Sequence, residues 1–149
     1  MSNPEIIPFA TTLHVRDTCL CMHLQRAART IAREFDTALK PVGLTNQQFS
    51  LLMALNRPEP PPMGPVATLL GTDRTTLTAA LKPLAQRGWV RVEPDANDRR
   101  SKRLALTKDG MAVLVEALPI WKKTHAAVEA RLVETDADHV RKALIEIGG

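Results

Sequence analysis

Hydroxyl and cationic side chains gather in one short stretch of the sequence, residues 73–87. Its apolar residues recur at three- and four-residue steps, which predicts an amphipathic helix. The residues expected on its inner face are Leu77, Ala80, Leu81 and Leu84. A helix that enters the major groove of DNA needs short side chains, hydroxyls for base edges or phosphates, and a methyl group for thymine. A plain surface helix is the alternative, but threonine is only a middling helix former, and three occur here within four residues. The polar residues predicted to contact DNA are Arg74, Thr75, Thr76, Thr78 and Lys82.

A second basic cluster follows a change of period in the sequence. Residues 89–93 and 102–106 alternate between apolar and polar, which predicts two strands joined by a polar tip over 94–101. A hairpin that projects beside a recognition helix can place arginine in the minor groove and neutralise phosphates. A solvated charged turn is the common alternative. The hairpin directly follows two helices predicted over residues 65–70 and 73–87, which form a helix-turn-helix, and this position favours DNA binding. The cationic residues of its tip and second strand are Arg99, Arg100, Lys102 and Arg103.

Side chains that could support catalysis or bind metal show no comparable grouping. No nucleophile lies at a suggestive spacing from a base, and the acidic residues fall mostly in caps, the hairpin and exposed helical faces. The two cysteines, Cys19 and Cys21, are too few for a disulfide framework, which fits a reducing compartment. The histidines have no ligand spacing typical of a metal site. We therefore expect no enzyme, no metal and no cofactor; the histidines are His14, His23, His125 and His139.

The other predicted elements are helices that surround these two motifs. Thr45 and Gln48 have the spacing of a capping box, Thr107 is a suitable N-cap, and Thr135 with Asp138 would open the last helix. Proline punctuates residues 1–12, predicted as an irregular arm, and residues 57–65, predicted as a loop. The predicted helices span residues 13–40, 46–56, 65–70, 73–87, 108–133 and about 136–146.

Both terminal helical regions carry long apolar stripes. A small central module cannot cover stripes of this length by itself, so packing against a second copy is the economical way to bury them. We therefore expect one mainly α-helical winged-helix module over residues 1–149 that forms a symmetric homodimer. Residues 13–40 and 108–147 would be the dimerisation helices, and residues 45–107 would be the DNA-binding lobe.

Charge and hydropathy agree with this interpretation without proving it. Lysine and arginine exceed aspartate and glutamate by 20 to 16, which gives a net charge of +4 and suits an anionic partner. No apolar run reaches the roughly 18 residues that cross a bilayer, so no membrane partner is expected. The N-terminus lacks the basic and apolar regions of a signal peptide. We expect a cytoplasmic protein.

The run VATLLGTDRTTLTAALKPLAQRGWVRVEPDANDRRSKRLALTKDG, which starts at Val66, resembles the core of the MarR (multiple-antibiotic-resistance regulator) family of winged-helix repressors. The resemblance extends from about Asp17 to Leu132 and includes GLTNQQFSLLMAL. Residues 95–100, DANDRR, resemble the family's Asp-x-Arg-Asp-x-Arg wing pattern, with Asn97 in place of its first arginine. The resemblance implies that Asp98 orients wing arginines by ion pairing, while Arg99 or Arg100 reaches DNA.

The same resemblance implies a dimer that binds a pseudo-palindromic operator in double-stranded DNA. It also implies a small-molecule effector, often an aromatic acid or phenolic compound, between the dimerisation helices and the DNA-binding lobe. His125 lies on the apolar seam of the helix predicted over residues 108–133. A histidine in such a position is usually a hydrogen-bonded core or interface residue, and a role in the wall of a ligand pocket is the less common alternative. The residues that would form it are His23, Arg29, Phe49, Trp121 and His125.

Cys21 offers an alternative signal. Its surroundings, CMHLQRAAR, resemble the reactive-cysteine segment of the family's organic-hydroperoxide-sensing branch. That branch holds its thiolate with tyrosines, and this sequence contains no tyrosine. Without such donors, a cysteine on an apolar stripe is more often an inert small hydrophobic residue. The sequence therefore predicts a ligand-released repressor first and a repressor switched by oxidation of Cys21 second.

Overall fold

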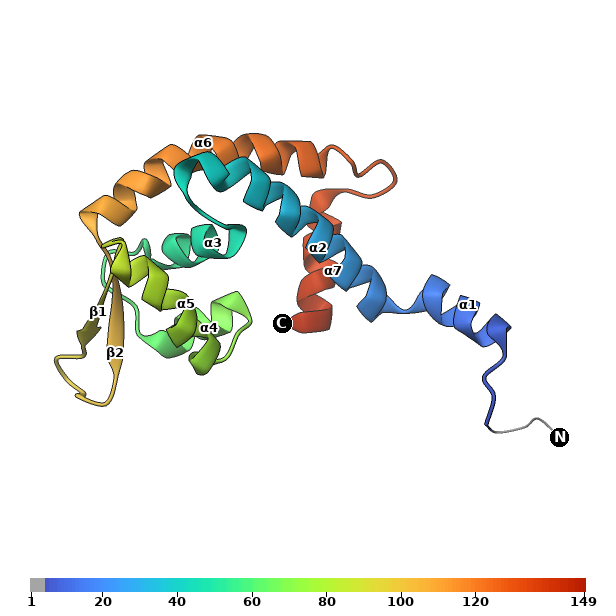
Figure 1. Cartoon of the computed structure of the whole chain (residues 1–149), viewed down its shortest axis with the longest axis horizontal. Coiled ribbons are helices and arrows are strands. Elements are labelled where there is room, and N and C mark those ends of the chain that lie inside the picture. The colour runs from blue at the N-terminus through green and yellow to red at the C-terminus, as the bar shows by residue number, and fades with distance from the viewer. Residues whose placement is uncertain (1–4) are drawn as a thin grey trace. The chain divides into compact units, whose positions relative to one another are not determined.

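The computed structural model of the chain describes residues 5–149 as a set of helices and one two-stranded hairpin (Figure 1). The chain divides into an N-terminal unit that ends at Glu34 and a larger unit that begins at Phe35. Within the described residues, every helix is too short or too polar to span a membrane. The elements in chain order are α1 (Phe9–Thr18), α2 (Leu20–Leu39), the 3-10 turn Lys40–Val42, α3 (Asn46–Leu55), α4 (Met63–Leu70), α5 (Arg74–Gln86), β1 (Val90–Pro94), β2 (Lys102–Leu106), α6 (Lys108–Glu129) and α7 (Ala137–Gly148).

The N-terminal unit corrects two expectations from the sequence. The irregular arm ends earlier than expected, because α1 already begins at Phe9; residues 1–4 lie outside the described part. The single helix expected over residues 13–40 is interrupted at Cys19, which has extended backbone angles (φ −67°, ψ 109°). The Thr18 hydroxyl donates to the carbonyl of His14 (2.6 Å) just before this break. Apolar periodicity reports which face of a helix is inward, and a one-residue break leaves that pattern nearly unchanged.

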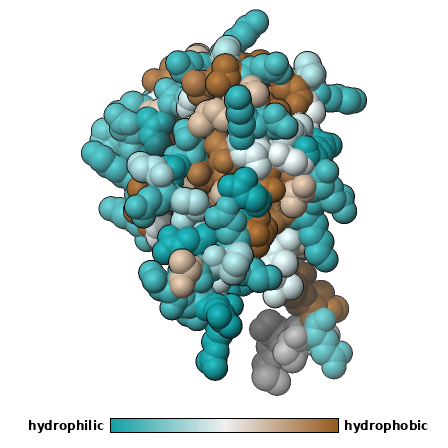
Figure 2. All heavy atoms as spheres, turned by 90° about the vertical axis from the view of Figure 1, so that its left-hand side faces the viewer, coloured by the Kyte–Doolittle hydropathy of each residue, from teal (hydrophilic) through white to brown (hydrophobic). Residues whose placement is uncertain are grey.

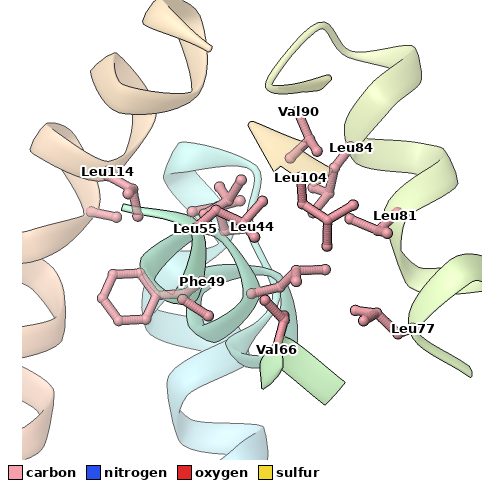
Figure 3. Packing of buried hydrophobic residues seen from close by; sticks show 14 of the residues in the cluster. Leu44, Phe49, Leu55, Val66, Leu77, Leu81, Leu84, Val90, Leu104 and Leu114 are labelled. Atoms are coloured by element: carbon pink, nitrogen blue, oxygen red, sulfur yellow. The ribbon is translucent and has the colours of Figure 1, made fainter. Parts of the chain in front are cut away.

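A leucine-rich core holds the larger unit together (Figure 3). It collects side chains from the end of α2 through α6, and no charged or polar residue among residues 5–149 is fully buried. Helix α5 contributes its inner face, and the hairpin contributes Val90 and Leu104. This packing fixes the helix-turn-helix and the hairpin in one body. The largest side chains with less than 2% exposure are Leu39, Leu52, Leu55, Val66, Leu77, Leu84 and Leu104.

The hairpin is antiparallel, with Val90 opposite Leu106 and Pro94 opposite Lys102. Its second strand also pairs with the proline-rich loop between α3 and α4. An isolated bridge joins Pro62 to Arg103, and the Leu104 N–H donates to the Pro61 carbonyl (2.9 Å). Proline cannot donate a backbone hydrogen bond, so this segment serves as an edge that only accepts at these positions.

Side-chain caps define the starts of α3, α5, α6 and α7. The capping box of Thr45 and Gln48 is confirmed, and Thr107 caps α6 by accepting from the Gly110 N–H (3.0 Å). The prediction that Thr135 opens the last helix is wrong by one residue. Asp136 is the cap, and its carboxylate accepts from the His139 N–H (2.8 Å). Threonine and aspartate both cap helices well, so the sequence alone does not distinguish Thr135 from Asp136.

The hairpin and α6 meet at Gly110. The Thr107 hydroxyl donates to the Gly88 carbonyl (2.6 Å), and the Thr107 N–H donates to the Trp89 carbonyl (3.0 Å). A Cβ atom on Gly110 would lie 2.2 Å from the Trp89 oxygen. The first turn of α6 can therefore approach the base of the hairpin only because residue 110 has no side chain.

Gly110→Ala is expected to lower the free energy of unfolding by about 2–3 kcal/mol, because the added methyl must push α6 away from backbone that cannot yield. Urea denaturation measures the change. Gly148→Ala is the matched control, since a Cβ atom at that position meets nothing within 4 Å. Equal stability of the two variants would show that the junction is looser than described.

Candidate nucleic-acid interface

Helix α5 separates its side chains as the sequence predicts. Leu77, Leu81 and Leu84 are buried, while all five predicted DNA contacts on this helix are exposed. Ala80 departs from the expectation, because it is exposed although it was placed with the inner face. It sits at the margin of the leucine stripe, where a small side chain leaves open space. The exposed predicted contacts are Arg74, Thr75, Thr76, Thr78 and Lys82.

The N-terminus of α5 is held by Asp73 and by the turn before it. The Asp73 carboxylate accepts from the Thr76 N–H (2.7 Å), and hydrogen bonds from Thr76 lower the pKa of Asp73 below its ordinary value. Gly71 ends α4 in the left-handed conformation (φ 66°), which glycine adopts without strain. The polar face of α5 is thus presented by a capped helix.

The hydroxyls on this face differ in what they can offer to DNA. Thr78 donates its hydroxyl proton to the Arg74 carbonyl (2.8 Å), which leaves its oxygen lone pair and its methyl group for a partner. The Thr75 hydroxyl forms no hydrogen bond within residues 5–149, so it can both donate and accept. The Arg74 guanidinium lies against α4, since a Cβ atom on Gly64 would be 3.2 Å from its Nη2 atom.

The tip of the hairpin is folded by its own acidic residues. The carboxylate of Asp98 accepts from the Arg100 N–H (3.0 Å) and from the Ser101 hydroxyl (3.2 Å). Within residues 5–149 Asp98 does not form the ion pair expected from the resemblance; its carboxylate closes the turn through a backbone N–H and a hydroxyl. An aspartate two residues before a backbone N–H forms such a turn without help from distant charges. Asn97, at the position of the family's missing arginine, is exposed, and its N–H donates to Asp95 (2.9 Å).

Arg103 anchors the hairpin, a role that the sequence did not predict. Its Nε donates to the Asp95 carboxylate (3.2 Å), and its Nη1 donates to the Pro60 carbonyl (2.8 Å). A hydrogen bond from the Asn97 N–H, followed by the charge of Arg103, lowers the pKa of Asp95. Together with the bridge at Pro62, these contacts attach the hairpin to the proline-rich loop between α3 and α4. In the sequence, Arg103 was indistinguishable from the other cations of the hairpin.

Arg91 of β1 pairs with Glu93 (2.6 Å), whereas the cations of the tip and the start of β2 have no such partner within residues 5–149. Arg99, Arg100 and Lys102 are exposed, and within residues 5–149 none of the three forms an ion pair. Unpaired cations can neutralise phosphates without first breaking an internal contact. Figure 2 views the side of the molecule that carries the hairpin, and hydrophilic side chains predominate on it.

Three of the five residues predicted to hold a ligand come together in the larger unit. The rings of Phe49 and Trp121 are stacked with centroids 6.2 Å apart, and Trp121 stacks on His125 at 4.6 Å. Trp121 and Phe49 also line a mainly apolar cavity of about 400 Å³ with Met53 and Leu118. The other two predicted residues, His23 and Arg29, belong to the N-terminal unit, where they line a separate groove of about 420 Å³.

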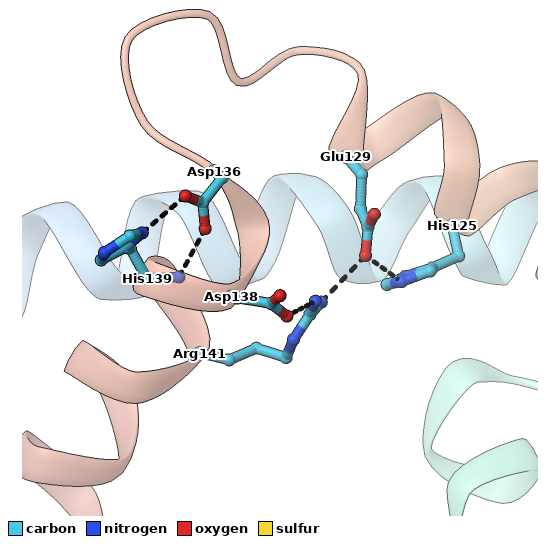
Figure 4. Close-up of polar contacts among 6 residues, drawn as sticks. All are labelled: His125, Glu129, Asp136, Asp138, His139 and Arg141. Carbon is cyan, nitrogen blue, oxygen red and sulfur yellow. Dashed lines mark hydrogen bonds and ion pairs between the residues drawn. The ribbon is translucent and has the colours of Figure 1, made fainter.

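A polar network extends from His125 into α7 (Figure 4). His125 Nε2 lies 2.6 Å from the Glu129 carboxylate, which also accepts from Arg141 (2.8 Å). The hydrogen bond from Arg141 lowers the pKa of Glu129, and the bond to Asp138, ahead of that to Glu129, raises the pKa of Arg141. The end of α6 is thereby tied to the start of α7.

The cysteines are both free thiols. Cys19 is half-buried at the break between α1 and α2, and Cys21 is exposed. Cys21 therefore does not sit in the apolar setting that its position on the stripe suggested. Within the described residues, no group of three or more potential metal ligands comes together.

Known proteins share this arrangement. The MarR family profile matches residues 44–102. The transcriptional repressor MprA of Escherichia coli K12 is 32% identical over 143 residues, which are 95% of this chain and 78% of MprA. The M. tuberculosis transcriptional regulator MosR, solved in complex with DNA, is 39% identical with a TM-score of 0.80 and covers 88% of this chain and 94% of its own. The transcriptional repressor CouR, solved on a 23-mer DNA duplex, is 32% identical with a TM-score of 0.70, over 89% and 92% of the two chains.

These likenesses extend across the helix-turn-helix, the hairpin and the flanking helices. With an exposed threonine-bearing helix beside a basic hairpin, and with relatives matched over most of its length, the chain belongs to the MarR family of winged-helix transcriptional regulators.

Proposed function

We propose that two copies of this chain bind a pseudo-palindromic operator in double-stranded DNA and repress transcription until a small aromatic or acidic ligand releases them. The carrying observation is the exposed polar face of α5 beside a wing whose Arg99, Arg100 and Lys102 have no ion-pair partner within residues 5–149. The relatives solved on DNA, MosR and CouR, support the same use of the fold. We propose a cytoplasmic location, because a regulator must reach the chromosome.

The exposed apolar residues support the homodimer. Helix α7 is amphipathic but buries none of its residues in the single chain. Ile145 is 64% exposed and Ile147 is 58% exposed, and Phe9 of α1 is 72% exposed. Apolar side chains at such spacing on terminal helices are what a second copy would cover. The dimerisation segments proposed from sequence, 13–40 and 108–147, contain most of α1, all of α2 and α6, and α7 except its last residue.

In the proposed mechanism, the dimer sets the distance between its two recognition helices. Consecutive major grooves on one face of DNA are separated by about 34 Å, so the two copies of α5 bind well only near this spacing. A ligand that prefers a dimer with another spacing lowers operator affinity by its differential affinity for the two states.

The geometry around Trp121 suits the aromatic part of such a ligand. Stacked rings with an adjacent apolar cavity offer an aromatic guest a large contact area. His125 on the same side could bind an acidic group, although Glu129 already occupies its Nε2. His23 and Arg29, the other two ligand residues proposed from the sequence, line a groove of the N-terminal unit.

The proposal is tested by sequencing the DNA fragments that the purified protein selects and by screening small aromatic acids for their release. Selection of one pseudo-palindromic sequence, with affinity that falls steeply as salt rises, is the expected result. A monomer, or a protein that ignores duplexes even in dilute buffer, contradicts it.

Arg99→Ala and Arg100→Ala are each expected to weaken operator binding by about 1–3 kcal/mol, because each removes a free cation from both wings of the dimer. The slope of log affinity against log salt should fall by about 1.8, two phosphate contacts at about 0.9 each. Fluorescence anisotropy over a salt series measures both. Dimerisation and melting should not change, since neither guanidinium forms an ion pair within residues 5–149.

Two variants serve as contrasts. Lys122→Ala removes one exposed cation from α6 and should leave operator binding unchanged. Thr75→Ala should alter sequence preference more than the salt slope, because its free hydroxyl is suited to a base edge. If the wing variants bind as the parent protein does, these arginines do not contact DNA.

Arg103→Lys separates charge from geometry in the wing. The substitution keeps the cation but loses the two-armed contact to Asp95 and Pro60, because an ammonium lacks the planar fork of guanidinium. We expect operator affinity to fall by about 1 kcal/mol with an unchanged salt slope. Lys102→Arg, a charge-preserving exchange on the same strand, is the control. A reduced salt slope in the Arg103 variant would mean that Arg103 itself binds phosphate.

Oxidation of Cys21 is a second candidate signal, favoured by the exposure of this thiol. Under this alternative, a hydroperoxide releases the operator from the parent protein and not from Cys21→Ser. Under the ligand-released mechanism, operator affinity before and after hydroperoxide is the same in both proteins, and this is the result we expect. Cys19→Ser controls for oxidation at the half-buried neighbour.

A further inference from the structure

Arg87 holds the C-terminal end of the recognition helix α5, where it is the capping residue. Its Nη1 donates to the Gly43 carbonyl, 44 positions away in the sequence (2.6 Å). The guanidinium also lies over the ring of Trp89, 4.8 Å from the ring centroid. A charged donor makes a stronger hydrogen bond than a neutral one, and arginine over tryptophan adds a cation–π attraction. Arg87 therefore fastens the end of α5 to the turn that follows α2.

The backbone at Gly43 is shaped for this contact. Gly43 ends the 3-10 turn Lys40–Val42 in the left-handed conformation (φ 75°), which glycine adopts without strain. A Cβ atom on Gly43 would lie 3.7 Å from Arg87 Nη1 and 3.8 Å from the Trp89 ring. Both side chains thus pack closely against the turn.

The two residues after Arg87 join the same end of α5 to the start of α6. The carbonyls of Gly88 and Trp89 accept from the hydroxyl and the N–H of Thr107 (2.6 and 3.0 Å). Thr107 directly precedes the proposed dimerisation segment 108–147, and Gly43 follows the segment 13–40 closely. Residues 87–89 therefore connect α5 to the chain beside both segments, at the corner where the hairpin and α6 begin (Figure 1).

The N-terminal end of α5 has different partners. Its cap, Asp73, accepts from Thr76 of the same helix, and Arg74 lies against α4, the other helix of the helix-turn-helix. A helix of thirteen residues is about 20 Å long. A rotation of about 10° around its C-terminal end therefore moves its N-terminus by about 3 Å, close to the rise of one base pair of DNA.

We propose that Arg87 is a positioning residue that sets the spacing between the two recognition helices, and with it the spacing of the operator half-sites that the dimer prefers. It acts through the Gly43 carbonyl and the Trp89 ring and does not bind phosphate. This inference rests on the homodimer and the operator binding proposed above, and it adds the residue that selects the spacing.

Arg87→Met tests this role, because methionine keeps an unbranched apolar stem against Trp89 and loses the donor to Gly43. The full-length proteins are bound to operators whose half-sites are moved apart or together by one base pair. The parent protein is expected to prefer one spacing by about tenfold, and Arg87→Met to reduce this ratio to about threefold or less. The slope of log affinity against log salt should not change.

Two results of this experiment overturn the proposal. A loss of affinity by the same factor at every spacing would mean that Arg87 only stabilises the fold. A salt slope lower by about 1.8 would mean that Arg87 binds phosphate in both halves of the dimer. If Arg87→Met does not fold, Arg87→Gln, whose side chain is shorter, gives the same test.

Arg91→Met is the matched control, because Arg91 is a nearby exposed arginine that pairs with Glu93 of its own strand. It should keep the spacing preference of the parent protein. A preference that weakens equally in both variants would remove the assignment to Arg87.

The distance between the two copies of α5 is also measured without DNA. Ala79→Cys, at an exposed position of α5, carries a spin label in a protein that also has Cys19→Ser and Cys21→Ser. Double electron–electron resonance should give one narrow distance, and adding Arg87→Met should broaden it or shift it by about 3 Å.

The two measurements separate this inference from the proposed function. A distance that depends on Arg87, in a dimer that binds no DNA, would contradict the proposed function and leave the positioning role standing. Operator binding with the same distance and the same spacing preference in both proteins would overturn the positioning role and leave the proposed function standing.

Discussion

The burial of one face of α5 determines which of its side chains face solvent, and the core that it joins also places the strand that follows. Leu77, Leu81 and Leu84 are the side chains by which this helix joins the core, and their burial turns the opposite face outward. Three well-buried leucines contribute on the order of 2 kcal/mol each, which far exceeds what the threonines lose or gain in water. The polar face is therefore exposed as a consequence of packing. The strand that follows is placed by the same core through Val90.

The wing shows how internal contacts decide which cations remain available. Four basic residues lie within five positions, yet Arg103 is held by Asp95 and the Pro60 carbonyl, while Arg99, Arg100 and Lys102 have no such contacts within the described chain. The acceptor at Pro60 belongs to the loop between α3 and α4. The orientation of the wing is thus tied to the loop that leads into the helix-turn-helix. Arg103 therefore positions the wing, and the positive charges of Arg99, Arg100 and Lys102 remain available to a partner.

The sequence predicted the features that depend on local patterns. The buried and exposed faces of α5, the strands of the hairpin and the capping box at Thr45 each follow from the chemistry of a few neighbouring residues. The break at Cys19 was missed because a one-residue interruption barely changes the apolar periodicity, and Asp136 was missed as a cap because its neighbour Thr135 caps nearly as well. Arg103 was missed for another reason. Its partners lie 8 and 43 positions away, and only the folded chain brings the Pro60 carbonyl to it.

The ligand residues illustrate the same limit more sharply. Phe49 and Trp121 lie far apart in the sequence, and they stack because α3 and α6 share the core. From this stack, contacts lead in two directions. His125 and Glu129 connect it to Arg141 of α7, while Ser50 lines both the Trp121 cavity and a second cavity between α3, α4 and α5. Helix α3 therefore lies between two apolar spaces, one next to the rings and one next to the recognition helix. Helix α3 also contributes Phe49, Leu52 and Leu55 to the core. Close-packed interiors cannot absorb a displacement locally, so any shift of α3 would be transmitted to the elements packed against it.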